Sequence, residues 1–213
     1  MKIWTYCRSE AGTARLNVSA LRMIALATLL MLPRLSQAHV DPQLTMGSFL
    51  GGLIHPVLGL DHFLAMVSVG IVSAQIGGRA IWTVPSTFVG VMTIGALLGW
   101  LEAGLPQTEL GIAFSVLALG TVIAMDKTLP VKLAMVAVAI FAVFHGYAHG
   151  AEMPVIADPA LYASGFVTGT AALHITGVII GDISQHYALG KKLLRIAGGA
   201  TAACGIGFIT GFI

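Results

Sequence analysis

Long apolar runs separated by short polar joints make up most of this sequence. An α-helix rises 1.5 Å per residue, so about 20 apolar residues cross the ~30 Å hydrocarbon core of a bilayer. Each run is long enough for at least one such crossing. The pattern therefore predicts an all-α, polytopic membrane protein in which six transmembrane helices form one bundle. The runs lie at about 47–77, 80–101, 108–125, 131–148, 160–181 and 193–213.

The first run is too long for a simple crossing. Its 31 residues would span about 46 Å as one straight helix. Two crossings in this run would invert the placement of every later charge, so we expect one crossing that is strongly tilted or broken. A break would fall at His55-Pro56 and Gly59, because proline removes a backbone hydrogen bond and clashes with the preceding turn. A tilted helix with a proline kink is the alternative.

The N-terminal segment is typical of a secretory signal peptide. A basic n-region precedes the apolar segment 23–32, and Ser36-Gln37-Ala38 provides a small-residue cleavage site. The prediction is a cleaved leader over residues 1–38 and a single transmembrane domain over 39–213. An uncleaved first helix is the alternative, but about ten apolar residues are too few to span the bilayer. Cleavage would leave His39 as the terminal residue.

Composition and charge agree with membrane insertion. The chain is 57% hydrophobic and 9% charged, whereas soluble domains carry about 25% charged residues. Cleavage removes five of eleven basic residues and one of nine acidic residues, so the net charge changes from +2 to −2. The basic character therefore belongs to the leader and does not indicate nucleic-acid binding. We expect membrane lipid to surround the apolar helices.

The basic residues of the remaining chain occupy alternate joints between the runs. The positive-inside rule places such joints in the cytoplasm. This predicts a multi-pass protein of the bacterial inner membrane with both mature termini in the periplasm, in agreement with a cleaved leader. The residues are Arg79 at the first joint, Lys127 and Lys132 at the third, and Lys191, Lys192 and Arg195 at the fifth.

Histidines and carboxylates lie inside these apolar runs or at their ends. Ionisable groups in hydrocarbon cost several kcal/mol, so they usually face a cavity, an ion path or one another. Imidazole and carboxylate together suit nickel, cobalt or zinc. The two cysteines, Cys7 and Cys204, are too far apart in sequence to indicate a thiolate site. The candidate metal ligands are His55, Asp61, His62, His145, His149, Glu152 and His174.

The spacing of the candidates sharpens the prediction. His145 and His149 are four residues apart and share a helical face, with Glu152 following on it. The alternative for these rings is hydrogen bonding to neighbouring carbonyls. His55 and His62 would lie about 10 Å apart along a straight helix, so they share an ion only if the helix breaks.

The remaining candidates are Asp61, His174 and His39. Asp61 is either a ligand, an acceptor that orients a ligating imidazole, or one half of a structural Asp–His hydrogen bond. His174 is either a ligand or a packing residue. A terminal His39 would chelate a metal through its amine and imidazole, and would serve as a capture site.

Three motifs resemble the HupE/UreJ family of bacterial nickel permeases. They are His55-Pro56-x-x-Gly59-x-Asp61-His62-x-x-Ala65-Met66, Phe144-His145-Gly146-x-Ala148-His149-Gly150-x-Glu152-x-Pro154, and Leu173-His174-x-x-Gly177. With the leader and six helices, the similarity covers essentially the whole chain. The resemblance implies secondary uptake of nickel, or of cobalt in some members, for hydrogenase, urease or cobalamin pathways. It also implies that the matching histidines and carboxylates recognise the metal.

The resulting hypothesis is a permease that moves Ni²⁺ or Co²⁺ from periplasm to cytoplasm, without enzymatic activity and without a permanently bound cofactor. No Gly-x-x-x-x-Gly-Lys-Ser/Thr motif occurs, so transport would be secondary or would depend on a separate energising partner. One alternative is an intramembrane zinc-dependent hydrolase with Glu152 or Asp61 as general base. The other is a membrane metal sensor or chaperone that does not transport.

Overall fold

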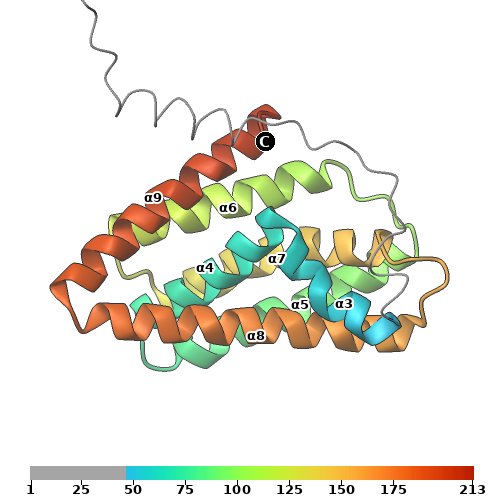
Figure 1. The fold of residues 1–213 in the computed structure, drawn as a ribbon, viewed down its shortest axis with the longest axis horizontal. Coiled ribbons are helices and arrows are strands. Elements are labelled where there is room, and N and C mark those ends of the chain that lie inside the picture. Colours follow the sequence, from blue (N-terminus) through green and yellow to red (C-terminus); the bar gives the residue numbers. More distant parts are fainter. Residues whose placement is uncertain (1–46) are drawn as a thin grey trace, which may run out of the picture. The chain divides into compact units, whose positions relative to one another are not determined.

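The computed structural model describes residues 47–213, and every regular element in that range is an α-helix (Figure 1). The leader, its cleavage site and His39 lie outside the described residues. The helices follow one another with joints of a few residues. They are α3 (Ser48–Leu58), α4 (Leu60–Ile76), α5 (Ala80–Trp100), α6 (Thr108–Met125), α7 (Val131–Ala151), α8 (Pro159–Gln185) and α9 (Ala188–Thr210).

The helices match the apolar runs, and the all-α membrane prediction is confirmed. Five helices, α5 to α9, are long and apolar enough to cross a bilayer, and α3 with α4 passes the same test as a pair. Counting that pair as one broken span gives the six spans that the sequence predicts. The fifth run extends beyond its expected limits, because α8 continues to Gln185.

The first span is broken, as the sequence allowed. α3 ends at Leu58, Gly59 has an extended conformation (φ −78°, ψ 114°), and α4 begins at Leu60. The two segments meet at a bend of 82°. Pro56 lies in the last turn of α3, where it weakens the helix ahead of the break. The alternative of one tilted helix with a simple kink is therefore wrong.

Glycines bring the helix backbones close together around the broken span. α5 packs chiefly on α7, α6 on α9, and both halves of the broken span on α8. A Cβ on Gly146 of α7 would overlap the Met92 carbonyl oxygen of α5, and one on Gly70 of α4 would overlap the His174 carbonyl oxygen of α8. Small residues at such crossings are typical of membrane helix pairs. They hold α7 against α5 and α4 against α8, and α4, α7 and α8 carry most of the candidate ligands.

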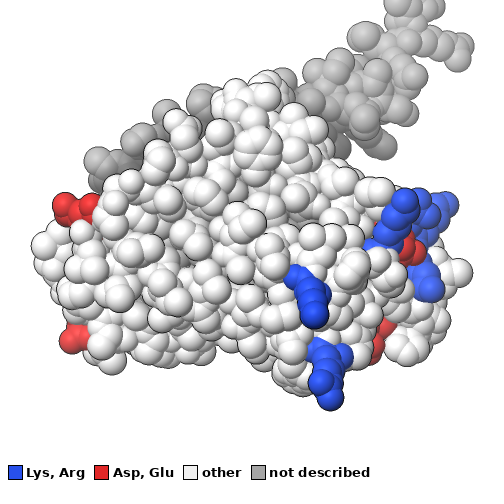
Figure 2. All heavy atoms as spheres, turned by 180° about the vertical axis from the view of Figure 1, so that it is seen from behind, with Lys and Arg blue, Asp and Glu red and all other residues white. Residues whose placement is uncertain are grey.

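Charged side chains separate along the bundle. On the face drawn in Figure 2, Lys and Arg gather toward one end, together with some acidic side chains, and at the opposite end the only charged side chains in view are acidic. This distribution follows from helices that cross in alternating directions, since alternate joints then meet at the same end. The charge pattern in the sequence is therefore also a pattern in space.

Candidate metal centre

Four histidines from three helices meet beside the break in the first span. We call His55, His62, His145 and His149 the histidine cluster. The ring centre of His62 lies 4.8 Å from those of both His145 and His149, and 6.1 Å from that of His55. The rings of His55 and His149 are also 4.8 Å apart. The bend at Gly59 thus brings together two histidines that a straight helix would keep apart.

The cluster lies in the interior of the bundle. His145 and His149 are 0% exposed, and His62 is 6% exposed. His145 and His149 share the buried face of α7, as their four-residue spacing predicts. Buried imidazoles need polar partners, so the hydrogen bonds of each ring decide what chemistry it can perform.

Asp61 fixes the orientation of His62. One carboxylate oxygen, Oδ1, accepts the backbone N–H of His62 at 2.7 Å and also contacts ring Nδ1 at 2.9 Å. A carboxylate only accepts hydrogen bonds, so Nδ1 carries the hydrogen and Nε2 of a neutral ring keeps its lone pair. This is the arrangement of a carboxylate that orients a ligating imidazole.

His55 is held at both ring nitrogens. Nε2 lies 3.2 Å from Oε2 of Glu152, and Nδ1 lies 3.0 Å from the hydroxyl of Tyr162 on α8. Glu152 caps the C-terminal end of α7, and its side chain is 49% exposed. His55 therefore links the exposed carboxylate to the buried rings. Sequence reasoning missed Tyr162, because a tyrosine in an apolar helix carries no signal of its own.

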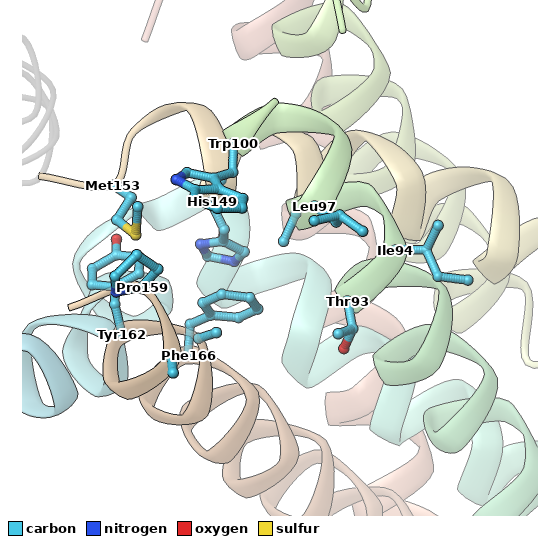
Figure 3. Close-up of a pocket in the computed structure, with 13 residues that line it drawn as sticks. Thr93, Ile94, Leu97, Trp100, His149, Met153, Pro159, Tyr162 and Phe166 are labelled. Carbon is cyan, nitrogen blue, oxygen red and sulfur yellow. The ribbon is translucent and has the colours of Figure 1, made fainter. Parts of the chain in front are cut away.

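His149 and His145 differ in their partners. The ring of His149 stacks on that of Phe166 at 4.9 Å with 9° between the planes, and Figure 3 shows the two side by side. Nε2 of His145 lies 2.8 Å from the hydroxyl of Ser115 on α6, a residue that sequence reasoning also missed. No backbone carbonyl among residues 47–213 accepts from either ring, contrary to the alternative interpretation of this pair.

Several ring nitrogens of the cluster have no place in these hydrogen bonds. Within residues 47–213, four buried ring nitrogens of the histidine cluster have no hydrogen-bond partner. An unsatisfied buried polar atom costs roughly 1–3 kcal/mol, so several in one place call for a functional explanation. We call these four the open nitrogens: Nε2 of His62, Nδ1 of His145, and Nδ1 and Nε2 of His149.

The open nitrogens are close to a metal-binding arrangement without forming one. In the described part of the chain, no group of three or more His, Cys, Asp or Glu side chains is placed so that it could hold an ion as it stands. At metal–nitrogen distances of about 2.1 Å, two imidazoles on one ion have ring centres about 5 Å apart. The observed 4.8 Å spacings match that separation, although the rings are not turned so that they could hold an ion together.

His174 lies apart from the cluster. The ring of Phe88 on α5 is 5.6 Å from that of His145 and 5.2 Å from that of His174, so it contacts both histidines. His174 is 2% exposed, and neither of its ring nitrogens has a partner within residues 47–213. The structure therefore joins six of the seven predicted ligands in one network and leaves His174 as a separate position.

Two cavities beside α5 and α8 are lined mainly by apolar side chains. The first, of about 380 Å³, meets the cluster only at His149 and is otherwise bordered by residues such as Leu97, Trp100 and Phe166 (Figure 3). The second, of about 560 Å³, meets His174. Apolar walls offer no ligands to a divalent cation, so the donor set of the cluster is the better candidate for a metal centre.

Comparison with known proteins places the chain in a family. The family model described as HupE / UreJ protein matches residues 26–208. Protein HupE of Rhizobium leguminosarum bv. viciae is 41% identical over 182 residues, which cover 85% of this chain and 94% of the relative. No solved structure matches the chain. Because the family model spans most of the chain, including the whole cluster, the protein belongs to the HupE/UreJ family.

Proposed function

We propose that the protein is a secondary permease that takes up Ni²⁺, or Co²⁺, from the periplasm through a path lined by histidines and carboxylates. The open nitrogens are the observation that carries this proposal. They concentrate imidazole donors in the interior of a membrane bundle, where unsatisfied polar atoms are costly. A divalent transition metal is the ligand class that this donor chemistry recognises.

Family membership supports the proposal at a coarser level. The HupE/UreJ family is a family of transporter-type membrane proteins that is associated with nickel and cobalt. Imidazole and carboxylate donors accept both metals, so the choice between them rests on transport measurements.

The order of the groups gives the proposed path. Glu152 is exposed at the end of α7, His55 follows at 3.2 Å, and the buried rings of the cluster come next. By the positive-inside rule, the end rich in Lys and Arg faces the cytoplasm, so Glu152 and both termini face the periplasm. His39 of the mature chain would serve as an outer capture site. His174 lies beyond Phe88 as a second position.

The arrangement suits transport better than hydrolysis. Asp61 already accepts two hydrogen bonds from His62, and Glu152 contacts His55, so both candidate general bases are engaged. A site that closes around an ion only after its rings rotate suits conduction, which needs binding weak enough to release the ion. A sensor or chaperone would share the site but would not accumulate metal in cells.

Asp61→Asn is expected to reduce nickel uptake about 10- to 100-fold. The amide lacks the charge that holds the Nδ1 hydrogen of His62, and loss of such an orienting group typically has this effect. This reduction is measured as the uptake of radioactive nickel and cobalt by cells that express equal amounts of wild type and variant. Asp182→Asn, at the exposed end of α8, is the matched control and should transport normally.

Two results would contradict the proposal. Equal uptake by wild type and Asp61→Asn would remove Asp61 and His62 from the transport path. Accumulation of neither metal above the level of cells without the protein would exclude a nickel or cobalt permease altogether.

A further inference from the structure

Ser115 occupies an unusual position beside the histidine cluster. Its side chain is 0% exposed on α6, and its oxygen has two neighbours. The Ile112 carbonyl oxygen of the same helix lies 2.6 Å away, and Nε2 of His145 on α7 lies 2.8 Å away. A serine hydroxyl has one hydrogen, so it can donate to only one of them.

The carbonyl determines where that hydrogen goes. Two oxygens 2.6 Å apart repel each other unless a hydrogen lies between them, and a carbonyl can only accept. Ser115 therefore donates to Ile112. Its oxygen must then accept from His145, so Nε2 of His145 carries a hydrogen. In a neutral imidazole the lone pair is left on Nδ1, which is one of the open nitrogens.

We infer that Ser115 is a positioning residue that fixes the tautomer of His145, so that this ring presents Nδ1 to the transported ion. This inference rests on the proposed function. His62 is held the opposite way, because Asp61 binds its Nδ1 and leaves Nε2 open. The two neighbouring rings therefore offer different ring nitrogens, one oriented by a carboxylate and the other by a hydroxyl.

The hydroxyl provides this control without adding charge. A second carboxylate beside His145 would place a further negative charge in the membrane interior, which is costly. A serine that is already bonded to its own helix has its hydrogen committed, so it acts as an acceptor only. Loss of the hydroxyl would leave the Nε2 hydrogen of His145 buried without an acceptor, as an Nδ1 hydrogen also would be, and would therefore remove the preference for one tautomer.

Nuclear magnetic resonance of metal-free, purified protein with isotope-labelled histidine tests the tautomer directly. The signal of His145 is assigned by its loss in His145→Gln. We expect the Nε2–H form in wild type and in Ser115→Thr, which keeps a hydroxyl, and a mixture of the two tautomers in Ser115→Ala. Ser73→Ala is the matched control, because Ser73 is also fully buried and bonds its own helix, to the Gly70 carbonyl at 2.7 Å.

Metal binding provides the second measurement. Equilibrium dialysis with Ni²⁺ should show about 10- to 100-fold weaker binding by Ser115→Ala, as for other groups that orient a ligand, and unchanged binding by Ser73→Ala. With isotope-labelled Cd²⁺ as a diamagnetic probe, scalar coupling should connect the ion to Nδ1 of His145 and to Nε2 of His62.

The outcomes separate this inference from the proposed function. An unchanged tautomer in Ser115→Ala, or coupling of Cd²⁺ to Nε2 of His145, would overturn the role of Ser115. Failure of wild-type protein to bind Ni²⁺ would overturn the proposed function instead, and the tautomer in metal-free protein would still decide what Ser115 does.

Discussion

His149→Leu is expected to abolish nickel binding and uptake while leaving the metal-free protein at least as stable as wild type. Both ring nitrogens of His149 are open nitrogens, and the side chain is 0% exposed against Phe166. Leucine has a similar size and removes two unsatisfied polar atoms, each of which costs roughly 1–3 kcal/mol. A residue kept for packing would show the opposite result, since its replacement would lower stability.

Thermal unfolding of purified protein with and without Ni²⁺ measures both effects. At a nickel concentration 100 times Kd, binding should stabilise the wild type by about 2.7 kcal/mol, and His149→Leu should gain nothing. His186→Leu is the matched control, because His186 is exposed and bonds the Asp182 carbonyl of its own helix. A normal nickel response in His149→Leu would exclude His149 as a ligand.

Gly146→Ala is expected to destabilise the protein by about 3 kcal/mol and to reduce nickel uptake with it. The new Cβ would overlap the Met92 carbonyl oxygen and approach the Ala96 backbone nitrogen of α5. These are backbone atoms, so α5 and α7 would have to separate. Gly146 lies between His145 and His149, and any such separation would displace both rings.

Gly90→Ala in α5 is the control for this substitution. A Cβ there would meet nothing within 4 Å, so alanine should be neutral or slightly stabilising through its higher helix propensity. The two variants are compared by thermal unfolding in the same detergent. Equal stability of both would mean that α5 and α7 do not approach as closely as the structure shows.

The fold was largely predictable because membrane helices follow directly from long apolar runs. The 31-residue first run was recognisable as one crossing, either tilted or broken, from its length and the charge at the next joint, and Pro56 with Gly59 marked where a break would fall. The 82° bend was not predictable, since its size depends on how α3 and α4 each pack against α8.

The sequence predicts only those site residues whose side chains are rare in membrane-spanning segments. Histidine and carboxylate inside apolar runs attract attention because burying them is costly. Ser115 does not, since its bond to the Ile112 carbonyl is what serines and threonines commonly form in helices, and Thr87 and Thr93 do the same. Only the tertiary structure shows that His145 also contacts the hydroxyl oxygen of Ser115.

Sequence position also could not separate His174 from the other ligands. The apolar surroundings and the motif of His174 resemble those of the cluster residues, so the sequence alone assigns it to the same set of ligands. The structure places Phe88 against both His145 and His174, which no pattern in α5 reveals because phenylalanine is common in apolar helices. Whether a residue belongs to one site or to a second position is decided by packing between helices.

The central claim is that the transported ion binds the open nitrogens of His62, His145 and His149. X-ray absorption spectroscopy of the nickel-loaded, purified protein tests this most directly. We expect nitrogen or oxygen neighbours at about 2.1 Å with the outer-shell scattering of several imidazole rings, which decreases in His62→Ala. A shell of oxygen atoms without imidazole, or sulfur at about 2.3 Å, would contradict the claim.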